Sequence, residues 1–119
     1  MKIIKFGGSS VENIQNIQLV FAILEKKLQE GELAVVFSAL GGVTEQLFAL
    51  AKMAMEGKDA FREGLAALEE KHLSLVEGLL PIEDRVEGSG YVRQRIQELE
   101  DLYHGIFLIK EQSLSLIHI

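Results

Sequence analysis

The feature that most constrains the fold is a strand, helix, strand pattern over residues 2–38. Residues 2–6 (KIIKF) and 33–38 (LAVVFS) are short, apolar and rich in β-branched or aromatic side chains, as buried strands are. Between them, apolar side chains recur every three or four residues and indicate one face of a helix that ends near Gly31; they are Ile14, Ile17, Phe21, Leu24 and Leu28. Because a parallel pair of strands needs such a crossover, the pattern predicts a right-handed parallel βαβ unit.

The remainder of the chain has the spacing of helices. Apolar positions predict a second helix over residues 43–54, a third over 61–79 and a long fourth over 92–106, the last preceded by the polar stretch EDRVEGSG at 83–90. The final SLSLIHI, residues 113–119, alternates apolar and polar, which leaves a third strand and a frayed end both open. The expected fold class is therefore α/β, with a βαβ unit followed by a helix-rich segment.

Composition argues against several classes of function. The chain has 119 residues, of which 48% are hydrophobic and 25% charged, as in one soluble globular domain. Its net charge of -6 argues against a nucleic-acid partner, and the absence of cysteine removes disulfides and thiolate chemistry. No apolar run approaches the roughly 18 residues of a membrane span, and the N-terminus lacks the pattern of a signal peptide. We therefore expect a cytoplasmic protein with no membrane partner.

The string KFGGSS, at the end of the first predicted strand, is suited to binding phosphate. Gly7 and Gly8 let the backbone approach an anion closely, and Lys5 adds a positive charge. Ser9 and Glu12 have the spacing of a capping box, which predicts an α-helix that begins directly after GGSS and points its positive N-terminus at the corner. The alternative is a tight turn whose glycines serve packing alone. The string also lacks the GxxxxGK[ST] spacing of the P-loop.

A second corner of the same kind, SALGGVT, follows the second predicted strand. It places Ser38, Gly41, Gly42 and Thr44 ahead of a helix. Because ligands of open α/β sheets bind at the carboxyl ends of the strands, two such corners on adjacent parallel strands predict a cleft for an anionic ligand. The alternative is a plain strand-to-helix turn in which Thr44 caps the helix.

KFGGSSV and VVFSALGGVTEQL resemble the two N-terminal motifs of aspartokinases, in the amino acid kinase family. That family usually has threonine where this chain has Ser9, so the hydroxyl is kept. The later ELEDLYHGIFLIKE is similar to bifunctional aspartokinase/homoserine dehydrogenases. The resemblance covers residues 1–111 and implies the N-terminal part of an amino acid kinase domain, with 112–119 as a non-matching tail. The family's later Gly-Glu motif, whose glutamate contacts aspartate, is absent, so we expect an N-terminal portion that is inactive by itself.

The resemblance also implies a reaction and its residues. The reaction is ATP-dependent phosphorylation of the side-chain carboxylate of L-aspartate, which belongs to lysine, threonine and methionine biosynthesis. The residues implied for the nucleotide phosphates are Lys5, Phe6, Gly7, Gly8 and Ser9, with Lys5 as the catalytic residue that stabilises charge during transfer. Those implied for aspartate are Ser38 and Thr44. Mg²⁺ would arrive with ATP, and no metal site is expected on the protein itself.

Other functions stay open from the sequence. The helix excess and the exposed edge of a two-stranded sheet are compatible with a non-catalytic helical assembly or regulatory module, and the same edge predicts a homo-oligomer. A glutamate or carbamate kinase would share the first glycine corner, although VVFSALGGVT favours aspartate. Among the three histidines, His72 is expected to be a satisfied, partly buried side chain, and none has metal-ligand spacing. Gly105 is expected at a close helix contact.

Overall fold

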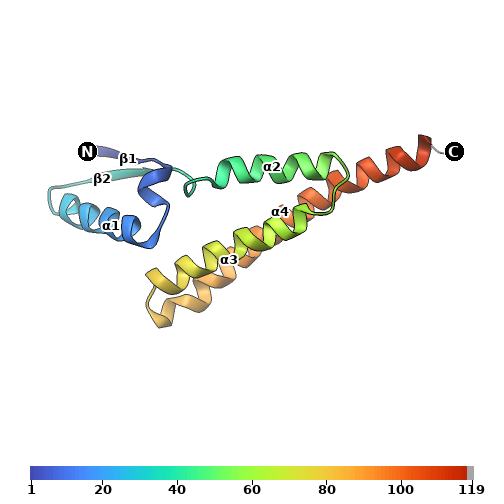
Figure 1. The fold of residues 1–119 in the computed structure, drawn as a ribbon. Coiled ribbons are helices and arrows are strands. Elements are labelled where there is room, and N and C mark those ends of the chain that lie inside the picture. The colour runs from blue at the N-terminus through green and yellow to red at the C-terminus, as the bar shows by residue number, and fades with distance from the viewer. Residues whose placement is uncertain (118–119) are drawn as a thin grey trace. The chain divides into compact units, whose positions relative to one another are not determined.

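The computed structural model describes the backbone of residues 1–117 and the side chains of residues 1–111. The chain divides into two compact units, Met1–Thr44 and Glu45–Ile119. In chain order the elements are β1 (Lys2–Phe6), the 3-10 helix η1 (Gly8–Val11), α1 (Ile14–Leu28), β2 (Leu33–Phe37), α2 (Val43–Met55), α3 (Phe61–Leu79) and α4 (Ile82–Ile117), most of them labelled in Figure 1. No helix within residues 1–117 combines the length and the apolar character needed to cross a membrane.

The first unit contains the predicted βαβ arrangement. β1 and β2 pair in parallel, with Lys2 opposite Leu33 and Phe6 opposite Phe37, and α1 connects them. β2 ends one residue earlier than predicted. After α1 the chain passes through Gly31, whose φ of 141° favours glycine, so the predicted end of this helix is confirmed.

Apolar side chains of α1 and of the sheet form the core of the first unit. Ile17, Val20 and Phe6 are buried, and the Phe6 ring stacks on Phe37 with a centroid distance of 5.7 Å. Phe21, which the spacing placed on the inner face, is 45% exposed. The buried stripe therefore runs through Val20, one position earlier than predicted.

The start of α1 differs from the prediction. Asn13 is extended and its side chain accepts a hydrogen bond from the amide of Asn16 at 2.8 Å, so Asn13 is the N-cap. The predicted capping box of Ser9 and Glu12 is therefore wrong, because the chain forms one turn of 3-10 helix before α1 begins. Asparagine is among the strongest N-cap residues, and here it directly precedes the apolar periodicity.

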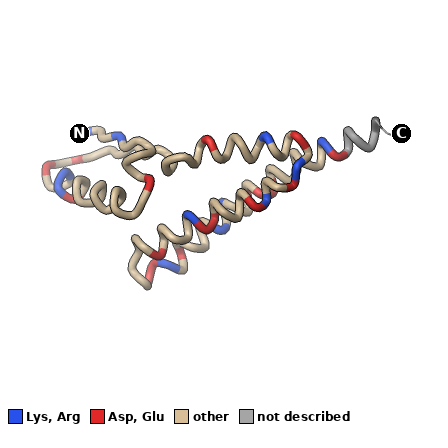
Figure 2. The backbone as a smooth tube through the Cα atoms, in the orientation of Figure 1, with Lys and Arg blue, Asp and Glu red and all other residues tan. Residues whose placement is uncertain are grey.

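The second unit is helical and confirms the predicted second and third helices. Its buried side chains are Leu50, Ala54, Phe61, Leu65, Leu68, Ile96 and Tyr103. The Phe61 ring lies 6.0 Å from the ring of Tyr103 and 6.0 Å from that of Phe107. The Tyr103 hydroxyl donates to the Leu47 carbonyl at 3.0 Å, which ties α4 to α2. Figure 2 shows acidic and basic residues interspersed along α3 and α4.

α4 is longer than predicted, because the polar stretch at residues 83–90 is helical and does not separate two elements. The turn before it lies at Leu80, whose extended backbone suits a residue followed by proline. Arg85 donates through Nε to the Leu80 carbonyl at 3.0 Å, and a Cβ on Gly88 would lie 2.7 Å from Leu80 Cδ1. Glycine thus lets this end of α4 approach α3 closely.

Of the two alternatives left open for residues 113–119, a third strand is not formed up to Ile117, since α4 continues that far. Residues 118 and 119 lie outside the described residues. The prediction for His72 is confirmed, because its Nδ1 lies 2.7 Å from the Leu68 carbonyl. The prediction for Gly105 is wrong: a Cβ there would meet no described atom within 4 Å. Gly64 and Gly88 are tight positions in these helices, and a Cβ on Gly64 would lie 2.2 Å from Leu50 Cδ2.

Candidate functional site

The two glycine corners lie against each other at the edge where β1 and β2 end. The first corner is KFGGSS, residues 5–10, and the second is SALGGVT, residues 38–44. A Cβ built on Gly8 would have the Ala39 carbonyl oxygen and Gly41 Cα at 3.5 Å and Ser38 Oγ at 3.6 Å. The parallel pairing carries through to this edge, because the Ser38 amide donates to the Phe6 carbonyl at 3.0 Å. The predicted adjacency of the corners is therefore confirmed.

Gly41 is the tightest point of this contact. A Cβ on Gly41 would lie 2.9 Å from Glu12 Cβ, 3.1 Å from Glu12 Oε2 and 3.2 Å from the Gly8 carbonyl oxygen. A side chain at this position would push the two corners apart. The glycine therefore serves close approach of the corners, and Glu12, which sequence reasoning assigned to helix capping, lies at their junction.

At the first corner, three backbone amides make no hydrogen bond to an acceptor within the described residues. Gly7 is extended and η1 begins at Gly8. The Ser10 amide donates to the Gly7 carbonyl at 3.1 Å. Within the described backbone of residues 1–117, the amides of Gly7, Gly8 and Ser9 donate to no protein acceptor. Consecutive free amides at a loop of this kind are able to donate to an anion.

The helix dipole makes a smaller contribution to this corner than the sequence suggested. We expected the N-terminus of α1 to point at Gly7 and Gly8, but η1 and Glu12 intervene before Asn13 caps α1. The positive end of a helix acts over about one turn. The local amides and Lys5 are therefore the groups at the corner that favour negative charge.

Lys5 and Phe6 occupy different faces of β1. Phe6 is buried with its ring packed on Phe37, whereas Lys5 is exposed, and successive strand residues point to opposite faces. The structure therefore places the predicted site residue Phe6 in the core. Lys5 belongs to none of the ion pairs formed by side chains 1–111, so no acidic side chain in this range neutralises its charge.

The two residues predicted to face an amino acid lie beyond β2. Ser38 is exposed, and its hydroxyl donates to the Ala39 carbonyl at 2.8 Å. Thr44 is exposed in the first turn of α2, which begins at Val43. Because Thr44 lies inside the helix, the alternative in which it serves as the N-cap is wrong. Gly42 precedes α2 with a φ of 81°, a conformation that favours glycine.

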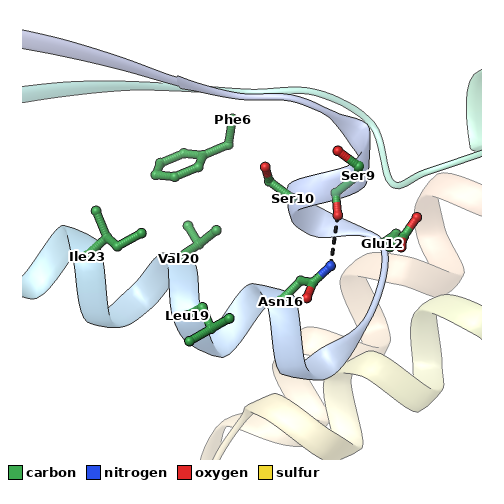
Figure 3. Close-up of a pocket in the computed structure, with 8 residues that line it drawn as sticks. All are labelled: Phe6, Ser9, Ser10, Glu12, Asn16, Leu19, Val20 and Ile23. Atoms are coloured by element: carbon green, nitrogen blue, oxygen red, sulfur yellow. Dashed lines mark hydrogen bonds between the residues drawn. The ribbon is translucent and has the colours of Figure 1, made fainter.

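A groove of about 390 Å³ adjoins the first corner (Figure 3). Its apolar wall is formed by Phe6, Leu19, Val20 and Ile23. Its polar wall is formed by Ser9, Ser10, Glu12 and Asn16. Asn16 holds this wall in place, because its Nδ2 donates to the Ser9 carbonyl at 2.9 Å. Sequence reasoning did not identify Asn16; its only signal was the asparagine pair at the start of the helical spacing.

Within residues 1–111, whose side chains are described, no three histidine, aspartate or glutamate side chains gather in a way that would hold a metal ion. The chemistry that the corners offer is therefore hydrogen bonding and single charges. One glutamate, free amides and hydroxyls lie around the joined ends of the two parallel strands, and Lys5 is the exposed penultimate residue of β1.

Comparison with known proteins places these corners in a family. The family model for amino acid kinases matches residues 1–87. The chain is 27% identical over 114 residues to the bifunctional aspartokinase/homoserine dehydrogenase of Buchnera aphidicola, and 30% identical over 111 residues to a chloroplastic one of Arabidopsis thaliana. Each alignment covers 93% of this chain but only 14% and 12% of the respective relative. The family match includes both glycine corners, and the chain belongs to the amino acid kinase family.

Proposed function

We propose that residues 1–44 form the part of an aspartate kinase that brings the phosphates of ATP next to L-aspartate. The proposed reaction transfers the γ-phosphate to the side-chain carboxylate of aspartate and releases ADP. The observation that carries the proposal is the contact between the two glycine corners, with Gly41 Cα 3.5 Å from the Cβ position of Gly8. The aspartokinases among the relatives support the choice of aspartate.

The first corner has the donors that phosphoryl transfer requires. This reaction asks the protein mainly to position its substrates and to neutralise charge. The free amides of Gly7, Gly8 and Ser9 would donate to phosphate oxygens, and the ammonium of Lys5 would offset the charge that develops on them. Bound Mg²⁺ would supply further neutralisation between the phosphates, and it would arrive with ATP.

The second corner would bind the acceptor. The hydroxyls of Ser38 and Thr44 are exposed and would donate to the carboxylates of aspartate. Ser38 would exchange its present bond to the Ala39 carbonyl for one to the substrate. Because the corners touch, a phosphate held at the first would lie beside an amino acid held at the second, as an in-line transfer requires.

Binding of a non-hydrolysable ATP analogue with Mg²⁺, measured by calorimetry, tests this proposal. We expect Lys5→Met to weaken binding by about tenfold or more, since a hydrogen bond to a charged group contributes about 1.5–3 kcal/mol. Lys26→Met is the matched control, because Lys26 is an exposed lysine in the last turn of α1, far along the chain from the corner. Equal binding by Lys5→Met and the wild-type chain, or no binding by the wild-type chain, would contradict the proposal.

A further inference from the structure

We propose that Asn16 is a positioning residue of the first corner, and that its side chain holds the Gly8 amide in the orientation in which it would donate to phosphate. The inference rests on the proposed function and deepens it, because it names what keeps a glycine-rich corner ready for an anion. Asn16 lies outside KFGGSS, in the first turn of α1, and is half-buried.

The side chain of Asn16 ties α1 to the first corner. Its Nδ2 donates to the Ser9 carbonyl at 2.9 Å, the hydrogen bond drawn in Figure 3. The backbone of Asn16 is itself held, because its amide donates to Asn13 Oδ1 at 2.8 Å. Both distances are those of good hydrogen bonds. The cap of α1 uses only the backbone of Asn16, so a change of the Asn16 side chain leaves the cap in place.

Two peptide groups carry the effect of this hydrogen bond to Gly8. The Ser9 carbonyl and the Ser10 amide belong to one planar peptide group, and the Ser10 amide donates to the Gly7 carbonyl at 3.1 Å. The Gly7 carbonyl belongs in turn to the same peptide group as the Gly8 amide. Because both peptide groups are trans, the N–H of each points opposite to its C=O. The bond that holds the Gly7 carbonyl therefore turns the Gly8 N–H outward, where it meets no acceptor within residues 1–117.

Packing alone does not fix this part of the corner. A Cβ on Gly7 would meet no described atom within 4 Å, and glycine has the widest choice of backbone conformations. Gly8 is approached by the second corner, with Gly41 Cα 3.5 Å from its Cβ position. The peptide group between Gly7 and Gly8 thus depends on hydrogen bonds for its orientation. A donor that is already oriented needs no reorganisation when an anion binds, which is the advantage that Asn16 would supply.

The affinity for a non-hydrolysable ATP analogue with Mg²⁺, measured by calorimetry on the full chain, is the first test. We expect Asn16→Ala to weaken binding by about fivefold, the order of one lost hydrogen bond. Gln15→Ala is the matched control, because it removes a neighbouring exposed amide side chain from the same turn of α1. This control should bind the analogue as the wild-type chain does.

The second test needs no ligand. Nuclear magnetic resonance order parameters of the ¹⁵N-labelled chain report how firmly the amides of Gly7 and Gly8 are held. We expect about 0.85 in the wild-type chain and in Gln15→Ala, and less than about 0.6 in Asn16→Ala. Asn16→Asp should show the same loss, because a carboxylate has no N–H to donate. This variant keeps the shape of the side chain and places an acid in the first turn, where it favours the helix, so α1 should stay folded.

Each outcome decides the inference. Unchanged affinity or unchanged glycine order parameters in Asn16→Ala overturn it, and so does an equal loss of affinity in Gln15→Ala. A merely structural role would lower the urea midpoint of the chain and leave the glycine order parameters at their wild-type values. Analogue binding that depends on Lys5 but not on Asn16 would overturn the inference and leave the proposed function standing. A wild-type chain that binds no analogue would contradict the proposed function, and the order parameters would still decide whether Asn16 holds the corner.

Discussion

Gly64 and Gly105 provide a matched test of how tightly the helices of the second unit pack. Both are helical glycines, Gly64 in α3 and Gly105 in α4. Replacing either one with alanine should gain the same helix propensity, about 1 kcal/mol. Their surroundings differ. A Cβ on Gly64 would lie 2.2 Å from Leu50 Cδ2 and 3.0 Å from Cδ1, whereas a Cβ on Gly105 would meet no described atom within 4 Å.

The expected free energies of unfolding follow from that difference. Carbon atoms in contact prefer a separation of about 3.5–4.0 Å, so the Leu50 methyl group would have to retreat by roughly 1.5 Å. Leu50 is only 4% exposed and its neighbours are packed, which makes the retreat expensive. Overpacking of this kind costs about 1–3 kcal/mol. Gly105→Ala should therefore stabilise by up to about 1 kcal/mol, and Gly64→Ala should be less stable than it by about 1–3 kcal/mol.

Urea unfolding followed by far-ultraviolet circular dichroism measures both variants. Because both substitutions lie in the same compact unit, the same transition reports both. The double variant Leu50→Ala/Gly64→Ala identifies the cause: against the Leu50→Ala background, which has room for the added methyl group, Gly64→Ala should become stabilising. The reasoning is refuted if Gly64→Ala stabilises the wild-type chain as much as Gly105→Ala does.

Two further predictions concern stability at alkaline pH and association. Burial raises the pKa of Tyr103 above its ordinary 10.0, so the stability that the protonated hydroxyl contributes is complete below pH 10.0 and is lost as the pH rises through the folded pKa. Tyr103→Phe should lower the free energy of unfolding by about 1 kcal/mol at neutral pH and reduce its decline at alkaline pH. Urea unfolding at several pH values measures both effects, and an unchanged alkaline decline in the variant would contradict the prediction. The chain should also self-associate, because Ile3, Leu19 and Phe48 are 70%, 64% and 73% exposed. The sedimentation coefficient should then rise with protein concentration, and Ile3→Lys should weaken the association. A monomer at every concentration would contradict this prediction.

Local pattern predicted most of the elements. The apolar spacing located α1, α2 and α3, and the small residues after β1 and β2 located the two corners. These features depend on neighbours within about one or two turns, so the local sequence is enough to predict them. The same reasoning misplaced the start of α1, because Ser9 and Asn13 are both suitable N-cap residues. Asn13 is the N-cap because the chain forms η1 between β1 and α1. It also treated residues 83–90 as a polar stretch that separates two helices. The glycine that weakens a helix in isolation, Gly88, instead allows close packing here.

The sequence by itself determined the donors of the candidate site: a lysine, two glycines and a serine at the end of one strand, and hydroxyls with two more glycines at the end of the next. Tertiary structure decided which of them meet. Parallel pairing of β1 with β2 joined Gly8 to Gly41 and brought Glu12 to their junction. The physical reason is that donors are a property of residue type and local turn chemistry, whereas their convergence depends on the register between segments separated by an entire helix.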